Sequence, residues 1–135
     1  MTIQGRKVRL FAVDAPELLQ TCTDKRGRSY DCGEAAAAAL RTLVRGTSLS
    51  CLVVRHDRYR RAVARCTRPA TLFQRAVDLS EWLLERGHAL VYRQYAGRYL
   101  GEYERLEAAA RKAGRGIWAG SFVPPWVWRK DLGWP

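Results

Sequence analysis

Apolar residues recur along this chain in two patterns, one typical of strands and one typical of helices. Residues 8–13 alternate between two faces, which predicts a short strand. Residues 49–54 and 62–66 have the same strand composition, and a charged turn at residues 57–61 separates them. These runs predict the sheet-forming part of the fold.

Three stretches favour helices. Residues 34–45 are rich in alanine and end before Gly46, a usual helix stop. A second helix is expected to begin at Asp78, which is followed three residues later by a glutamate, as in a capping box. The third stretch, residues 102–113, carries apolar residues on one side and stops at Gly114.

The order of these elements predicts an α+β protein, mainly a β barrel packed by three helices. We find no internal repeat or linker in the sequence and expect a single domain over residues 1–135, with a core of about residues 2–118. Residues 119–135 form a tail rich in proline and tryptophan. We expect its tryptophans to close the core rather than to bind a ligand; they are Trp126, Trp128 and Trp134.

Charge narrows the class of partner. Lysine and arginine number 24 against 13 acidic residues, a formal net charge of +11. That balance favours a polyanion, with nucleic acid first and an acidic polysaccharide or a membrane surface next. No apolar run approaches the ~20 residues of a membrane-spanning helix, so no membrane association is expected. The first six residues lack the apolar segment of a signal peptide.

Residues 9–17, RLFAVDAPE, describe a short strand with a cation near its start and two carboxylates where it ends. Pro16 cannot donate to a strand ladder and favours an exit from the sheet. Strict alternation would put Arg9 and Asp14 on opposite faces, so a shared site requires a bulge or a strand end between them. This combination suits a hard cation and a phosphate held together. The plainer interpretation is a strand followed by a turn.

Four motifs in this order resemble the staphylococcal nuclease family. They are residues 9–17 (RLFAVDAPE), 57–61 (DRYRR), 78–87 (DLSEWLLERG) and 114–118 (GRGIW), so the resemblance spans roughly residues 2–118. It implies an OB-type barrel with three helices. It also implies a Ca²⁺-dependent phosphodiesterase, acting as an endonuclease or exonuclease on DNA or RNA with little sequence preference.

The resemblance implies a role for each residue of the first two motifs. Arg9 and Arg61 correspond to the family's catalytic arginines, and each guanidinium is able to grip phosphate oxygens through paired hydrogen bonds. Asp14 and the backbone carbonyl of Ala15 are oxygen ligands of the kind that Ca²⁺ prefers. Glu17 is the candidate general base, or the group that orients the attacking water beside the metal.

Aromatic residues near these motifs are candidates for contact with nucleic acid. Tyr59 and its neighbour Arg58 lie in the second motif, and Tyr92 and Tyr95 resemble the family's nucleotide-contacting tyrosines. Aromatic rings stack on bases with little regard to sequence, which favours a single-stranded partner. The alternative for Tyr92 and Tyr95 is a partly buried packing role under the third helix.

Two departures from the family pattern bear on catalysis. The family's Asp-Gly-Asp-Thr turn supplies a further metal aspartate, and Met1-Thr2 stands at that place here. The strand before that turn is missing too, so we expect an unpaired barrel edge that a homodimer could cover. Arg60 replaces the glycine of the family's second motif, a position where a left-handed backbone costs more.

Four cysteines make an even set, and none has the C-x-x-C spacing of a zinc site. Three disulfide pairings are possible. We favour Cys22–Cys32, which closes the loop after the acidic motif, and Cys51–Cys66, which joins neighbouring strands. Disulfides imply an oxidising compartment, so we expect a periplasmic or secreted protein, as in secreted bacterial members of the family with extra cysteines.

Two functions from different classes are open to this sequence. The first is the Ca²⁺-dependent phosphodiesterase. The second is a catalytically impaired nuclease-like module that binds nucleic acid or another polyanion and serves exopolysaccharide biosynthesis of the succinoglycan type. The missing aspartate favours the second, whereas Arg9, Asp14, Glu17 and Arg61 together favour the first.

Overall fold

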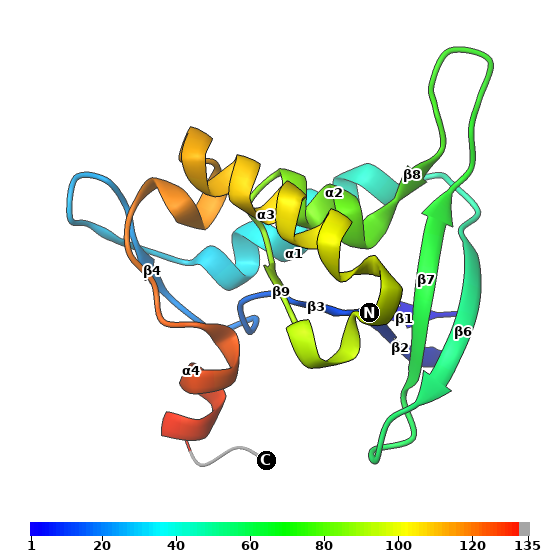
Figure 1. The fold of residues 1–135 in the computed structure, drawn as a ribbon, viewed down its shortest axis with the longest axis horizontal. Helices are drawn as coiled ribbons and strands as arrows, with labels where there is room; N and C mark the ends of the chain where they lie inside the picture. The colour runs from blue at the N-terminus through cyan, green and yellow to red at the C-terminus, as the bar shows by residue number, and fades with distance from the viewer. Residues whose placement is uncertain (133–135) are drawn as a thin grey trace.

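The computed structural model describes residues 1–132, in which strands and helices alternate along the chain (Figure 1). The strands are β1 (Thr2–Ile3), β2 (Arg6–Leu10), β3 (Val13–Asp14), β4 (Cys22–Thr23), β5 (Ser29–Tyr30), β6 (Ser50–His56), β7 (Ala62–Arg68), β8 (Val77–Asp78) and β9 (Leu90–Val91). The α-helices within these residues are α1 (Cys32–Val44), α2 (Leu79–Glu85), α3 (Leu100–Ala113) and α4 (Pro125–Asp131). Short 3₁₀ turns precede and follow α3. The predicted α+β class is confirmed.

The main sheet has the strand order β1-β2-β7-β6, with β8 pairing beside β7. β2 runs parallel to β7, whereas β1 pairs antiparallel to β2, and β6 and β8 pair antiparallel to β7. The turn at residues 57–61 joins β6 to β7, as predicted. Two smaller pairs, β3 with β9 and β4 with β5, lie outside this sheet. No closed barrel is detected among residues 1–132, but the main sheet with its short accessory pairs is consistent with the expected OB-type arrangement.

A backbone kink separates β2 from β3 and sets the direction of the acidic motif. Ala12, four residues before Pro16, has φ 58°, in the left-handed region, and the chain has already left the main sheet after Leu10. Tertiary contacts hold this kink: the Ser80 hydroxyl donates to the Phe11 carbonyl at 2.9 Å, and the Tyr92 N–H donates to the Ala12 carbonyl at 2.8 Å. The predicted break between Arg9 and Asp14 therefore exists, but at Ala12 rather than at the proline.

α1, α2 and α3 lie on one side of the main sheet, whereas α4 lies apart from it (Figure 1). α2 begins at Asp78, whose side chain accepts a hydrogen bond from the Glu81 N–H at 3.0 Å, so the predicted cap is present. Its Leu83 and Leu84 join a core cluster with Phe11 and Tyr103 of α3. α1 lays Leu40, Leu43 and Val44 against a second cluster around β7. No helix among residues 1–132 is both long and apolar enough to cross a membrane.

The segment that we expected to be a tail forms a fourth helix. Pro125 occupies the first turn of α4, where its missing N–H has no intrahelical partner to lose. Trp126 packs against a cluster that contains Cys22, Cys32 and Ile117, so this tryptophan does help to close the core. Trp134 lies outside the described residues. The expected three helices are thus four within residues 1–132.

Two exposed apolar features lie at the margins of the sheet. β6 pairs with β7 on one side and has no strand partner on the other side among the described residues, and Leu52, Val53 and Val54 are exposed on it. The loop of residues 69–76, between β7 and β8, projects away from the body of the molecule (Figure 1). Its tip carries Leu72 and Phe73, which are 90% and 89% exposed.

Candidate active site

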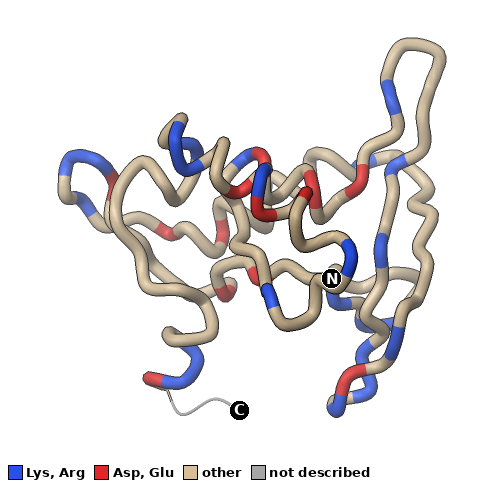
Figure 2. Tube along the Cα trace, viewed as in Figure 1, with Lys and Arg blue, Asp and Glu red and all other residues tan. Residues whose placement is uncertain are grey.

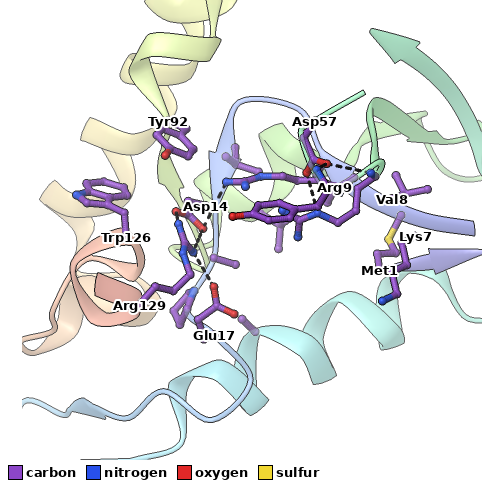
Figure 3. Close-up of a pocket in the computed structure, with 18 of the residues that line it drawn as sticks. Met1, Lys7, Val8, Arg9, Asp14, Glu17, Asp57, Tyr92, Trp126 and Arg129 are labelled. Atoms are coloured by element: carbon purple, nitrogen blue, oxygen red, sulfur yellow. Dashed lines mark hydrogen bonds and ion pairs between the residues drawn. The ribbon is translucent and has the colours of Figure 1, made fainter. Parts of the chain in front are cut away.

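A cleft of about 1150 Å³ opens between β2, the β6–β7 turn and α4. All the residues that the sequence singled out for catalysis, metal binding or nucleic-acid contact line it: Arg9, Asp14, Ala15, Glu17, Arg58, Tyr59, Arg61, Tyr92 and Tyr95. Figure 3 shows how side chains from these separate segments converge. The structure therefore brings the predicted site residues to one place.

The acidic end of the cleft is rigidly built. Asp14 is 6% exposed and ends β3, where it pairs with Leu90 of β9. Glu17 follows in a loop whose position Gln20 fixes, because the buried Gln20 side chain accepts from the Glu17 N–H at 3.1 Å and donates to the Val123 carbonyl at 2.7 Å. Gly33 allows the first turn of α1 to approach this loop, since a Cβ there would lie 1.7 Å from the Glu17 carbonyl oxygen.

Two predicted arginines border the cleft from different segments. Arg9 of β2 places Nη2 3.9 Å from Asp14 Oδ1, and its guanidinium lies 5.2 Å from the ring centre of Tyr92. Arg61 ends the β6–β7 turn, and its Nε donates to the Asp57 carboxylate at 2.7 Å. Both guanidinium groups border the cleft, where a phosphate could meet them.

The β6–β7 turn keeps its conformation without a glycine. Arg60 has φ 64°, the left-handed value that we expected arginine to avoid. Hydrogen bonds close the turn: the Arg60 N–H donates to the Asp57 carbonyl at 3.0 Å, and the Asp57 carboxylate accepts from the Tyr59 N–H at 2.9 Å. The strain at Arg60 is therefore tolerated and Arg61 still points into the cleft.

The tyrosines differ in how accessible they are. Tyr92 is half-buried between the Arg9 guanidinium and the indole of Trp126, which stacks on it with ring centres 5.8 Å apart. Tyr95 is more exposed and lies under the Arg55 guanidinium at 4.6 Å. Tyr59 is exposed on the β6–β7 turn beside Arg58. Tyr59 and Tyr95 are thus the more accessible rings, whereas Trp126 of α4 stacks on Tyr92.

Arg129 is the site residue that the sequence reasoning missed. Its Nη1 donates to Asp14 Oδ1 at 2.9 Å and to Glu17 Oε1 at 2.6 Å, and its Nη2 donates to Asp14 Oδ2 at 2.7 Å (Figure 3). It is three residues after Trp126 on α4, so both side chains leave the helix on the same face. Had the tail been recognised as a helix, this spacing would have placed a cation beside the aromatic cluster.

Positive charge dominates the surroundings of the two acids. Hydrogen bonding to Asp14 raises the pKa of Arg129; burial opposes this rise, and hydrogen bonding to Glu17 adds to it. Basic positions also cluster at the β6–β7 turn (Figure 2), and Arg58 and Arg61 of this turn line the cleft. A polyanion entering the cleft would therefore meet guanidinium groups before it reaches the acids.

The oxygen donors at this wall of the cleft are of the kind that a hard cation prefers, but they are few. The carboxylate of Asp14, the carbonyl of Ala15 and Glu17 acting through water are oxygen donors at one wall of the cleft. Among residues 1–132, however, no three His, Cys, Asp or Glu side chains gather as a metal cluster. The carboxylates of Asp14 and Glu17 already share one cation, the guanidinium of Arg129. A divalent ion at these oxygens would compete with that guanidinium for the same carboxylates.

Two disulfides brace the elements around the cleft. Cys22–Cys32 closes the loop after the acidic motif, and Cys51–Cys66 joins β6 to β7. This is the pairing that the sequence favoured. Beside the first bridge, backbone hydrogen bonds join the tail to the body: Thr23, next to Cys22, exchanges them with Ser121 at 2.8 and 2.9 Å.

Comparison with known proteins agrees with this geometry. A family model described as staphylococcal nuclease homologue matches residues 7–120. The chain is 37% identical over 117 residues to the succinoglycan biosynthesis protein ExoI of Rhizobium meliloti (strain 1021), a match that covers 86% of this chain and 57% of that protein. It is 35% identical over 121 residues to the probable endonuclease LCL3 of Schizophyllum commune, covering 83% of this chain and 40% of that protein.

A third relative is an uncharacterized endonuclease of Escherichia coli O157:H7, 28% identical over 124 residues, which are 91% of this chain and 70% of that protein. The chain thus spans about half the length of the first two relatives, 57% and 40%.

Proposed function

The chain belongs to the staphylococcal nuclease homologue family, and we propose that it hydrolyses phosphodiester bonds in DNA or RNA with little sequence preference. One observation carries this proposal: two arginines, two acids and three tyrosines from separate segments line a single cleft. Relatives named as endonucleases support the reaction class. We also propose that residues 1–135 form a single domain.

The two predicted arginines would bind and stabilise the phosphate. Arg9 approaches from β2 and Arg61 from the β6–β7 turn, so a phosphate between them would be held on two sides. Planar guanidinium groups donate paired hydrogen bonds that a lysine ammonium cannot reproduce. Loss of one such contact in the transition state costs about 3–4 kcal/mol, a hundredfold or more in rate.

Glu17 would act as the general base or orient the attacking water. It lies on a loop fixed by Gln20, and its carboxylate faces the same cleft as the two arginines. A carboxylate in that place is able to accept a proton from water as the water attacks phosphorus. The leaving oxygen would depart on the side opposite the attack.

We place a proposed Ca²⁺ ion at Asp14 and the Ala15 carbonyl, with Glu17 reached through water. When bound, it would polarise the phosphate and lower the pKa of a bound water. Because the site has one carboxylate as a direct ligand, we expect weak affinity, with a dissociation constant on the order of 10⁻⁴–10⁻³ M.

The substrate would lie across the aromatic residues. Arg58 and Tyr59 extend from the β6–β7 turn, and Tyr95 carries Arg55 on its face. Exposed rings reach bases that are not already paired, so we propose a preference for single strands. Tyr92 would join this surface only when Trp126 is off its ring.

A second function, binding without cleavage, is supported by Arg129. It neutralises both acids that hydrolysis needs, and no third His, Cys, Asp or Glu joins them among residues 1–132. A catalytically impaired module of this kind would bind nucleic acid or another polyanion. The name of the ExoI relative refers to succinoglycan biosynthesis, which fits an acidic polysaccharide as that polyanion.

Cleavage of labelled single-stranded DNA with millimolar Ca²⁺, against an EDTA control, tests the hydrolase proposal. We expect chelator-sensitive cleavage that Glu17→Gln and Arg61→Lys each reduce at least a hundredfold. Glu85→Gln, which changes an exposed acid on α2, should retain full activity. Salt-sensitive DNA binding without cleavage would instead establish the impaired module.

Two further expectations concern assembly and location. We propose that the free side of β6, with its exposed Leu52 and Val53, supports a homodimer, which light scattering after size exclusion would detect. We also propose export to the periplasm or the medium, because both disulfides require an oxidising compartment. Thiol titration of protein recovered from each cell fraction would test this.

A further inference from the structure

Arg129 occupies the position of a cation between Asp14 and Glu17. It makes three hydrogen bonds of 2.6–2.9 Å to the two carboxylates, and its own side chain is 17% exposed. Each oxygen of Asp14 and one of Glu17 accepts from it. These are the oxygens that a metal ion bound at this wall of the cleft would need.

Some positive charge is required at this point. Asp14 is almost fully buried, and a buried carboxylate beside a second carboxylate is unfavourable unless a cation balances the pair. Arg9 forms a looser ion pair with Asp14, with 3.9 Å between Arg9 Nη2 and Asp14 Oδ1. Arg129 therefore supplies most of the charge balance in this structure, and a divalent ion at the same oxygens would repel it.

α4 couples this contact to the tyrosine surface. Trp126 and Arg129 lie on one face of the helix, so the indole stacks on Tyr92 while the guanidinium holds the acids. Release of Arg129 would remove one polar anchor of α4, whose start would still be held by the buried Pro125 and by the bond from Gln20 to the Val123 carbonyl. A shift of the helix about that start would lift the indole of Trp126 off the Tyr92 ring and loosen its packing on the core cluster.

We propose that Arg129 is an internal counter-cation that a divalent ion must displace, and that its release moves α4 away from Tyr92. Metal binding and exposure of the Tyr92 ring to a base would therefore occur together. This inference rests on the proposed function, since it concerns the same acids. It adds a residue and a helix that regulate access to them.

Calorimetric titration with Ca²⁺ alone tests the exchange without any substrate. We expect Arg129→Gln to bind Ca²⁺ at least tenfold more tightly than the unmodified chain. Lys130→Gln is the matched control: it removes one positive charge from the next, exposed position of α4 and should change the affinity less than twofold. An Arg129→Gln affinity equal to or weaker than that of the unmodified chain overturns the proposal.

Tryptophan fluorescence tests the movement of α4. We expect Ca²⁺ to change the emission of the unmodified chain, and Trp126→Phe to remove most of that change. Arg129→Gln should show the changed emission before Ca²⁺ is added. Tight Ca²⁺ binding with unaltered tryptophan emission would overturn the part of the proposal that concerns α4.

A conservative variant guards against loss of folding. Arg129→Lys keeps one charge but cannot make the paired contact to Asp14, so its Ca²⁺ affinity should fall between those of Arg129→Gln and the unmodified chain. If Arg129→Gln fails to fold, Arg129→Lys decides the question by the same titration, and an affinity no tighter than that of the unmodified chain overturns the proposal.

The two proposals fail in different ways. Tighter Ca²⁺ binding by Arg129→Gln with no cleavage by any variant would refute the hydrolase and leave the exchange standing. Cleavage by the unmodified chain, with no gain in affinity in Arg129→Gln, would refute the exchange and leave the hydrolase standing. In that case Arg129 would belong to the phosphate-binding arginines.

Discussion

The carboxylate of Asp57 holds Arg61 at two points, accepting from its backbone N–H at 2.9 Å and from its Nε at 2.7 Å. The residues are four apart at the two ends of the β6–β7 turn, so the turn itself fixes the direction of the guanidinium. Burial alone would raise the pKa of Asp57, but hydrogen bonds from Arg61 and from the Tyr59 N–H lower it overall.

Asp57→Asn should therefore lose stability in a pH-dependent manner. The folded pKa is depressed, so the stabilisation is present above the unfolded value of about 3.9 and is lost as the pH falls through the folded value. Because the ion pair is partly exposed, we expect a loss of about 1 kcal/mol at pH 7. Urea unfolding of both proteins between pH 2 and pH 7 measures it, and a difference that stays constant over this range would contradict the assignment.

Arg60→Gly should leave the protein as stable as before or make it more stable. Glycine removes the cost of a left-handed backbone, about 1–2 kcal/mol. Against this gain, glycine raises the entropy of the unfolded chain, which lowers the free energy of unfolding by about 0.5–1 kcal/mol. Arg58→Gly, two positions earlier and without a positive φ, has only the entropic effect, so its free energy of unfolding should fall by about 0.5–1 kcal/mol. Thermal unfolding of the pair gives the comparison; equal losses would mean that Arg60 is unstrained.

Glu107→Ala should destabilise the fold by about 2–3 kcal/mol. The carboxylate of Glu107, 7% exposed, accepts from the Val91 N–H at 2.7 Å and from Arg93 Nη2 at 2.7 Å, so its loss leaves a buried donor unpaired. Glu104→Ala is the matched control one turn away, since Glu104 meets the same Arg93 but is 45% exposed, and it should cost less than 1 kcal/mol. Chemical unfolding measures both, and similar losses would show that burial at Glu107 is unimportant.

The two disulfides should separate stability from activity. Replacing Cys51 and Cys66 by alanine opens a loop with a sequence separation of 15 and should cost about 3 kcal/mol while the cleft residues keep their positions. Replacing Cys22 and Cys32, with a separation of 10, should cost a similar amount and also reduce activity, because the loop after Glu17 loses its brace. Unfolding and cleavage assays on both double variants test this, and equal activity in the two would argue against a role for the first bridge in the site.

Local sequence chemistry was enough to predict much of the fold. The cap at Asp78, the stop at Gly114 and the turn at residues 57–61 each depend on neighbours in the chain, and the structure contains all of them. The kink at Ala12 was not predictable in this way. Alanine has no preference for a left-handed backbone, and contacts from Ser80 and Tyr92 impose it.

The same distinction, between features set by neighbours in the chain and features set by distant contacts, applies to the site. Arg9, Asp14, Glu17 and Arg61 lie in motifs that resemble a known family, so their convergence was predicted. Arg129 belongs to no such motif, and a pair of prolines made its segment look like an irregular tail. Its contact with Asp14 spans 115 positions of sequence, a separation that local patterns do not encode.

The projecting loop of residues 69–76 has a consequence for how the molecule can be divided. Leu72 and Phe73 at its tip are accessible to a protease such as chymotrypsin, and both disulfides lie on the N-terminal side of them. A single cut there would yield two fragments joined by no covalent bond among the described residues. One fragment would carry Arg9, Glu17 and Arg61, and the other would carry Tyr92 and Arg129. The protein is thus a natural candidate for fragment complementation, in which the half with the proposed chemistry is prepared apart from the half that restrains it.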